Sequence, residues 1–308
     1  MKAARIFAKT HRLANLMKNT TEKPEILETS MEILEKLSYY LSFSFVRYAL
    51  IVGILVSLCA SLLGTVLVLR RYSLIGDGLS HAAFGAYSVA VTMKLVSDSF
   101  FTIPVTVLCA VFLLCMDKKR KVQSESLIAM ISVGALAFGY LVMNVFSTSA
   151  NISGDVCTTL FGSTSILTLT KGKVAVSVLI SCVTIAAFIF FYNRIFSATF
   201  DPDFLRTEDR FAGIYDILVA VITAVVIVLA MNLVGSLLIT AILVFPPLSA
   251  MRIMKSFKST VIYSAALGAF SSFLGIMISI VLSTPVGATI VIIDIMIFAL
   301  HCFAGKFL

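Results

Sequence analysis

Two residues of this sequence combine a carboxylate and an imidazole within largely apolar surroundings. Asp77 and His81 stand four positions apart at the start of a long apolar stretch. On an α-helix this spacing places both side chains on one face, one turn apart. A carboxylate oxygen beside an imidazole nitrogen suits divalent transition metals such as Mn²⁺, Zn²⁺ and Fe²⁺. The same spacing also fits a structural Asp–His hydrogen bond, so the residue types alone leave both interpretations open.

The composition places this pair in a membrane. Of the 308 residues 59% are hydrophobic and 13% are charged, and the mean hydropathy is +1.04. Soluble domains carry about 25% charged residues, so the chain is predicted to be an integral membrane protein. Within a membrane segment an ionisable pair is costly, which makes Asp77 and His81 a functional-site hypothesis. The six cysteines include no C-x-x-C pair, and the sequence therefore indicates neither a disulfide framework nor a zinc cage.

Apolar stretches long enough for transmembrane helices recur along the chain, and we expect eight or nine spans. They cover approximately residues 45–69, 73–93, 100–116, 126–146, 174–192, 214–231, 233–250, 260–281 and 287–304. Spans of about 17–25 residues fit helices, whereas barrel strands need only about ten. Pro246 and Pro247 interrupt the end of the seventh stretch, which makes it the least regular. The predicted fold class is all-α, a polytopic transmembrane helix bundle.

Residues 1–43 form a polar, basic arm ahead of the first apolar stretch. From Ile26 to Leu41 apolar residues recur at helical spacing with glutamates between them. This pattern predicts an amphipathic helix lying at the membrane surface. We therefore divide the chain into an arm, 1–43, and a transmembrane domain, 44–308.

Lysine and arginine are concentrated on one side of the predicted bundle. The opposite side carries only Lys94, Lys171 and Lys173 in its loops. Thirteen basic residues lie in the loops 70–72, 117–121, 193–211 and 251–259 and at the C-terminus. The basic side is therefore predicted to be cytoplasmic, and the net charge of +8 is explained by positive loops rather than by nucleic-acid binding. The basic arm disagrees with this orientation, and the sequence leaves its side of the membrane open.

No motif for ATP hydrolysis or hydrolase chemistry is present. The sequence contains no G-x-x-x-x-G-K-[ST], G-x-G-x-x-G, G-x-S-x-G or H-E-x-x-H pattern. If the protein transports its substrate actively, either an ion gradient or a separate ATP-hydrolysing subunit must drive it.

Four other ionisable residues in or near the apolar stretches are expected to be structural. Asp294 and His301 are seven residues apart on one helical face, and whether they contribute to transport is left open. Asp155 is expected to cap a loop, and Asp216 to favour the dipole at a helix start.

The basic loop at 199–213 is predicted to contain a short helix. Asp201 before Pro202 is typical of an N-cap followed by proline at the first helical position. Phe200 and Phe204 add apolar side chains to this charged segment. The segment could dock a partner or be an ordinary solvated loop, and the sequence leaves both open.

Four segments carry a recognisable set of motifs. Residues 70–82 are R-R-Y-S-L-I-G-D-G-L-S-H-A, residues 200–202 are F-D-P, residues 234–250 are V-G-S-L-L-I-T-A-I-L-V-F-P-P-L-S-A, and residues 284–288 are T-P-V-G-A. In this order, over roughly residues 50–300, they resemble the integral-membrane permease of ABC importers for zinc, manganese or iron. That group is the type II importer class related to the cobalamin and siderophore permeases. The chain departs from the family patterns at Tyr72, Leu205, Asp209, Pro247 and Ser283.

The resemblance implies a multi-pass protein of the cytoplasmic membrane that is not itself an enzyme. Two permease copies would pair with two ATP-binding subunits inside and one extracytoplasmic metal-binding protein outside. Asp77 and His81 match the family's metal-coordinating aspartate and histidine. Phe200, Asp201 and Pro202 match the start of its ATPase-coupling segment. No permanently bound cofactor is implied, and the transported ion would be Mn²⁺, Zn²⁺ or Fe²⁺.

Three alternatives stay open, and so does the choice of metal. The chain could be a gradient-driven secondary metal transporter, a permease for a metal chelate, or a membrane scaffold in which Asp77 and His81 are only structural. Depth also bears on the metal site. If a straight helix follows Arg71, the pair lies only one to two turns from the cytoplasmic face. A curved or broken span at Gly76 and Gly78 would place it deeper, and a straight helix there would count against a metal site.

Overall fold

The computed structural model describes residues 36–95, 98–116, 124–146, 169–210 and 212–306. Within these ranges the regular structure is helical and contains no strand, which confirms the predicted all-α class. Nine helices coincide with the nine apolar stretches: α2 (Ser44–Leu69), α3 (Ile75–Thr92), α4 (Asp98–Met116), α5 (Ser124–Phe146), α7 (Lys171–Phe190), α10 (Ala212–Val234), α11 (Ser236–Ile253), α12 (Phe257–Leu282) and α13 (Val286–Ala304). Two short helices, α8 (Tyr192–Phe200) and α9 (Pro202–Glu208), lie between α7 and α10.

Six of these helices are long and apolar enough to cross a membrane: α2, α5, α7, α10, α12 and α13. The apolar parts of α4 and α11 are shorter, covering Phe100–Leu114 and Leu238–Ile253, and α3 belongs to neither group. The predicted count of eight or nine spans is therefore not confirmed. A multi-pass helical bundle is confirmed.

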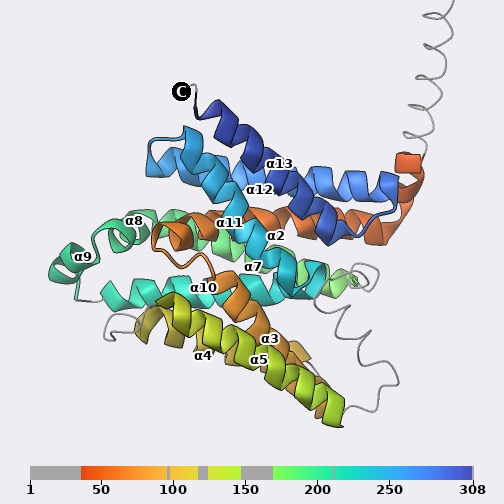
Figure 1. The fold of residues 1–308 in the computed structure, drawn as a ribbon, viewed down its shortest axis with the longest axis horizontal. Coiled ribbons are helices and arrows are strands. Elements are labelled where there is room, and N and C mark those ends of the chain that lie inside the picture. Colours follow the sequence, from red (N-terminus) through yellow and green to blue (C-terminus); the bar gives the residue numbers. More distant parts are fainter. Residues whose placement is uncertain (1–35, 96–97, 117–123, 147–168, 211, 307–308) are drawn as a thin grey trace, which may run out of the picture.

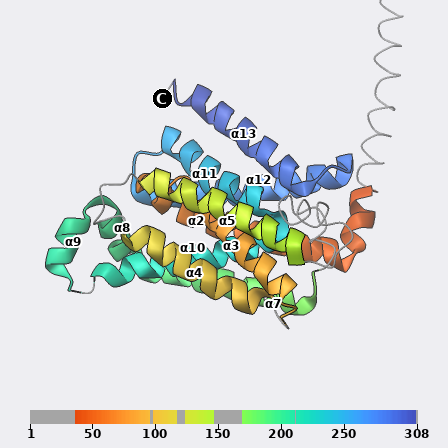
Figure 2. The same ribbon diagram turned by 60° about the horizontal axis from the view of Figure 1, so that its bottom comes forward.

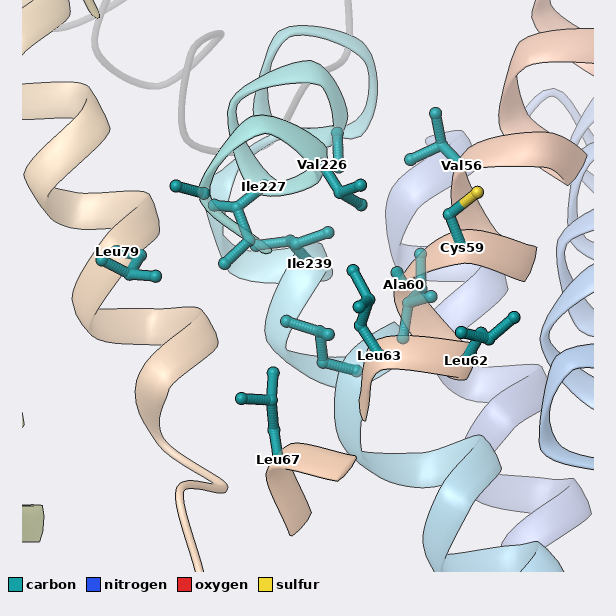
Figure 3. Packing of buried hydrophobic residues seen from close by; sticks show 14 of the residues in the cluster. Val56, Cys59, Ala60, Leu62, Leu63, Leu67, Leu79, Val226, Ile227 and Ile239 are labelled. Atoms are coloured by element: carbon teal, nitrogen blue, oxygen red, sulfur yellow. The ribbon is translucent and has the colours of Figure 1, made fainter. Parts of the chain in front are cut away.

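Helix α2 lies at the centre of the bundle, packed against α12, α11, α10 and α7 (Figure 1). Its apolar residues meet those of α10 and α11, where Leu63 and Leu67 lie near Ile227 and Ile239 (Figure 3). On the other side of α10, α3 packs between α4 and α5. Helix α3, which carries Asp77 and His81, is thus enclosed by neighbouring helices, as ionisable residues in membrane bundles usually are.

Both prolines of α11 lie inside the helix, so the prediction that they interrupt its end is wrong. Proline at 246 cannot donate to the oxygen of Ile242, and the hydroxyl of Ser61 on α2 donates to that oxygen instead, at 3.3 Å. The next freed oxygen, on Leu243, is approached so closely by Gly64 that a Cβ there would clash with it. Helix α2 therefore supports the proline-containing turn of α11, as neighbouring helices do in membrane proteins.

The two ends of the bundle are clearly different. Helices α8 and α9 project beyond the other helices at one end (Figures 1 and 2). At the other end Lys36, just before α2, donates from Nζ to the oxygen of Val281 near the end of α12, at 2.8 Å. The described last part of the N-terminal arm therefore lies on the face opposite α8 and α9. The rest of the predicted amphipathic helix lies outside the described residues.

Candidate functional site

The chain between α2 and α3 turns back into the bundle. Helix α2 ends in a Schellman turn, in which the N–H of Arg71 donates to Val68 and that of Tyr72 donates to Leu67, at 3.0 and 2.8 Å. Arg71 takes the left-handed position of this turn, with φ of 63°, where glycine is usual. From there the link leads back toward the middle of the bundle before α3 begins (Figure 1).

Helix α3 is continuous from Ile75 to Thr92, so the span is not broken at Gly76 and Gly78. The non-helical stretch precedes the helix, because the Schellman turn and the link occupy residues 70–74. The expectation that Asp77 would be shallow assumed that a straight helix follows Arg71 directly, whereas α3 begins only at Ile75. The depth of Asp77 depends instead on how far the link at residues 70–74 runs into the bundle before α3 begins at Ile75.

Two neighbours show how deep the start of α3 lies. Gly76 packs against Thr240, since a Cβ at Gly76 would lie 3.3 Å from the Cα of Thr240. Thr240 precedes Arg252, at the α8–α9 end of α11, by about 18 Å of helix. Ser132, which bonds to Asp77, follows the start of α5 by about 12 Å. Asp77 therefore lies about 12–18 Å of helix from the α8–α9 end of the bundle, which is about half the thickness of a bilayer core.

Asp77 and His81 lie on one face of α3, as their spacing predicts. Asp77 Oδ1 and His81 Nε2 are 3.2 Å apart, and the side chains are 36% and 8% exposed. The hydroxyl of Ser132 on α5 donates to Asp77 Oδ2 at 2.6 Å. Ser132 was not predicted, because no local pattern links a serine to a carboxylate 55 residues earlier on another helix.

The imidazole of His81 keeps one nitrogen unused. With Nε2 directed at Asp77, the buried Nδ1 has no hydrogen-bond partner among the described residues. A neutral imidazole has one donor and one acceptor nitrogen, so donation from Nε2 leaves Nδ1 with a lone pair. An unpaired buried acceptor is costly. Nδ1 lies on the side of the ring away from Asp77, so an ion bound there would not also contact that carboxylate.

One copy of the chain offers too few ligands to enclose a metal ion. The described residues contain no group of three or more His, Cys, Asp or Glu side chains arranged to hold one. Asp77 and His81 are two such side chains, whereas enclosed transition metals take about four or more ligands. The half-exposed carboxylate leaves room for ligands from outside this chain.

Asp294 and His301 are not brought to Asp77. On α13 His301 directs Nε2 at the hydroxyl of Tyr263 and Nδ1 at the oxygen of Ile297, at 2.9 and 2.8 Å. Nε2 thus joins α13 to Tyr263 on α12, and Nδ1 is used within α13 itself. Asp294 is 2% exposed, and its Oδ2 has no partner within the described part of the chain.

The predictions for the other two ionisable residues, Asp155 and Asp216, differ in how far the structure tests them. Asp155 lies outside the described residues. Asp216 is the fifth residue of α10, beyond its first turn, so the predicted role at the helix dipole is wrong, and its Oδ1 lies 2.8 Å from Nη1 of Arg70. The partner of Asp216 is therefore a cation on another helix, which helix-start reasoning does not identify.

The predicted short helix in the basic loop is α9. Asp201 caps it by accepting from the N–H of Phe204 at 2.9 Å, and Pro202 takes the first helical position, both as predicted. Leu205 is buried against α8 and the start of α10. Phe200 and Phe204 are 56% and 57% exposed at the projecting end. The segment contains a capped helix anchored by Leu205, and it presents two aromatic side chains to a partner or to solvent.

Comparison with known proteins identifies relatives over nearly the whole chain. The model of the family described as ABC 3 transport family matches residues 42–305. The manganese import system permease protein ScaB of Streptococcus gordonii is 27% identical over 263 residues, which are 85% of this chain and 91% of that protein. The high-affinity zinc uptake system membrane protein ZnuB of Haemophilus influenzae is 25% identical over 256 residues, 83% of this chain and 95% of that protein.

Two solved structures share the fold. PsaBC from Streptococcus pneumoniae in complex with Fab superposes with a TM-score of 0.76 at 27% identity, over 87% of this chain and 95% of that one. An inward-facing conformation of a putative metal-chelate type ABC transporter superposes with a TM-score of 0.66 at 15% identity, over 83% of this chain and 85% of that one. The second likeness is one of fold alone.

Proposed function

The chain belongs to the ABC 3 transport family, and from this membership we propose that it is the permease subunit of an ATP-driven importer for Mn²⁺ or Zn²⁺. It is a multi-pass membrane protein and a transport component rather than a catalyst. The relatives named above carry manganese or zinc in their descriptions, and this supports those two metals ahead of iron. We place the protein in the cytoplasmic membrane, with α8 and α9 on the cytoplasmic side, because the basic loops lie at that end.

One observation carries the proposal at the level of residues. A carboxylate and an imidazole lie 3.2 Å apart on one face of α3, so one cation can bind Asp77 Oδ1 and His81 Nε2 in place of the hydrogen bond between them. Asp77 and His81 are therefore the proposed metal ligands. Because one chain supplies two, a second copy would supply the matching pair, and four ligands replace much of the hydration shell of a divalent cation.

The remaining parts of the assembly follow from the two ends of the bundle. The sequence has no phosphate-binding loop, so ATP hydrolysis would belong to separate subunits, two for two permeases. The coupling segment would begin at Phe200, Asp201 and Pro202, and α9 would dock on the ATP-binding subunit. An extracytoplasmic binding protein would deliver the ion at the opposite end.

The boundary and span predictions fit this picture. The family match begins at residue 42, which supports a permease domain over 44–308 and a separate arm over 1–43. Helix α3 together with the link at residues 70–74, α4 and α11 are proposed to cross with the six longer helices, since their apolar neighbours shield them. That gives nine spans, the last of which returns the chain to the cytoplasmic side.

Metal must bind at Asp77 and His81 only weakly, because an ion that is held tightly does not leave. Docking of the binding protein would release the ion between the two permeases. Closure of the ATP-binding subunits would then displace α9 and change the surroundings of the pair.

The test is metal uptake by the complex reconstituted in liposomes with its ATP-binding and extracytoplasmic proteins. Mn²⁺ and Zn²⁺ are expected to accumulate in the compartment that the ATP-binding subunits face, and only when that compartment contains ATP. Fe²⁺ and a ferric siderophore are added as competitors. Uptake that persists without ATP and collapses with an uncoupler would instead establish a secondary transporter. Competition by the siderophore alone would establish a chelate permease.

A further inference from the structure

The guanidinium of Arg70 contacts both elements that flank α9. Its Nη1 lies 2.8 Å from Oδ1 of Asp216 in the first turns of α10. Its Nε lies 3.4 Å from the hydroxyl of Thr199, one residue before the end of α8. The side chains of Arg70 and Asp216 are only 11% and 10% exposed. A single buried cation thus contacts the chain just before and just after the proposed docking helix.

Helices α8, α9 and the start of α10 are joined to one another. Arg194 on α8 lies 3.7 Å from Oδ2 of Asp209, and the hydroxyl of Tyr215 on α10 lies 3.0 Å from the same oxygen. Leu205 fills the space between the three helices and is 1% exposed. A displacement of α9 must therefore carry Thr199 and Asp216 with it.

On its other side Arg70 is joined to the proposed metal pair by a short, ordered link. Arg70 is the C-cap of α2, and Asp77 follows it by seven residues. Tyr72 is buried, and its main-chain oxygen accepts from the N–H of Ile75 at 3.1 Å. The main-chain oxygen of Leu74 accepts from the N–H of Gly78. The link is thus held by main-chain hydrogen bonds from the end of α2 to the first turn of α3.

We propose that Arg70 is a positioning residue that transmits displacement of α8 and α9, through Thr199 and Asp216, to the link and so to Asp77 and His81. This inference rests on the proposed import function. The contact is suited to change, because the buried Nη2 of Arg70 has no partner among the described residues and can pair with a different acceptor in another arrangement. Coupling between two sites requires such an element, with two arrangements that each site biases.

Only an arginine fits this role. Its planar fork reaches Thr199 and Asp216 at once, whereas the ammonium of lysine is a compact point charge. Arg70→Lys therefore keeps the charge and loses the simultaneous contact, and Asp216→Asn removes the charge opposite it. Arg71→Lys is the matched control, because Arg71 is adjacent and exposed and its side chain takes no part in the contact.

The experiment measures Mn²⁺ uptake and ATP hydrolysis on the same vesicles, with the complete complex reconstituted. Arg70→Lys and Asp216→Asn are each expected to lower the Mn²⁺ taken up per ATP hydrolysed by about tenfold, within the usual range of coupling between sites. The double variant is expected to be no worse than either single one, since both remove the same contact. Mn²⁺ binding to the detergent-purified permease is expected to match the unsubstituted protein in all variants.

Several results would overturn the inference. One is an unchanged ratio of uptake to hydrolysis; another is losses that add in the double variant. A fall in uptake that only follows the amount of assembled complex would make the contact purely structural. If the unsubstituted complex moves neither Mn²⁺ nor Zn²⁺ with ATP, the proposed function fails, and this inference fails with it. If it moves metal and the ratio is constant across variants, this inference alone fails.

Discussion

The hydroxyl of Ser132 on α5 lies 2.6 Å from Oδ2 of Asp77 on α3 and donates a hydrogen bond to it. Because Oδ1 faces His81, the two helices together fix the direction of the carboxylate. Groups that orient a metal ligand in this way affect metal affinity without touching the metal.

Removing the hydroxyl of Ser132 should weaken metal binding without removing a ligand. Ser132→Ala is expected to reduce Mn²⁺ affinity by about tenfold, because the freed carboxylate samples other orientations. Ser132→Thr keeps the hydroxyl and is the matched control. Titration of the purified permease with Mn²⁺, followed by electron paramagnetic resonance, measures the effect. Equal affinities in Ser132→Ala and in the unsubstituted protein would contradict a positioning role for Ser132.

Adding a methyl group at Gly64 should destabilise the bundle. Gly64→Ala places a Cβ against the oxygen of Leu243, and overpacking of this kind costs about 1–3 kcal/mol. Gly172→Ala on α7 is the control, because a Cβ there meets nothing within 4 Å. Thermal unfolding in detergent is expected to occur at lower temperature for Gly64→Ala alone. Similar unfolding temperatures for both variants would show that α2 and α11 do not approach as described.

Asp294 should be dispensable as an ionisable group. Burying an unpaired charge in a membrane bundle is costly, and no cation pairs with this carboxyl among the described residues. Asp294→Asn keeps the shape and the capacity for hydrogen bonds, so metal uptake is expected to stay within about twofold. Asp77→Asn, which lacks the charge that attracts the metal, is the comparison and is expected to lose uptake. Loss of uptake in Asp294→Asn would place Asp294 in the transport path.

Phe204 should contribute to docking of the ATP-binding subunit. Its side chain is exposed at the projecting end of the bundle, and exposed aromatic side chains often dominate the binding energy of an interface. Phe204→Ala is expected to weaken binding of the ATP-binding subunit by about tenfold while leaving the unfolding temperature unchanged. Phe100→Ala, at the opposite end and 84% exposed, serves as the control. Binding kinetics of the immobilised permease in nanodiscs separate the two variants, and equal affinities would remove Phe204 from the interface.

The sequence predicts the helices well, because apolar stretches of membrane length have few alternative structures. It also predicts the Asp77–His81 pair and the Asp201 cap, since both depend on spacing within a single helix. The sequence does not predict contacts made between helices. Ser132 reaches Asp77 across 55 residues, and Ser61 reaches the proline-freed oxygen of Ile242 across 181.

The position of the pair within the membrane is the instructive case. The apolar stretch at 73–93 predicts one helix starting at the cytoplasmic face, and helix rise then makes Asp77 shallow. The structure instead uses Arg71 in a left-handed turn, a conformation that sequence patterns assign to glycine. The residues that follow Arg71 run into the bundle. The depth of Asp77 therefore depends on a turn that the sequence does not predict, because the turn contains no glycine.

The central claim is that Asp77 and His81 bind the transported metal, and pulsed electron paramagnetic resonance of Mn²⁺ bound to the purified permease tests it most directly. We expect hyperfine coupling from an imidazole nitrogen to the bound Mn²⁺ in the unsubstituted protein and in Asp294→Asn. We expect that coupling to disappear in His81→Gln, and metal binding to be lost in Asp77→Ala. Nitrogen coupling that persists in His81→Gln, or full Mn²⁺ binding by Asp77→Ala, would contradict the account.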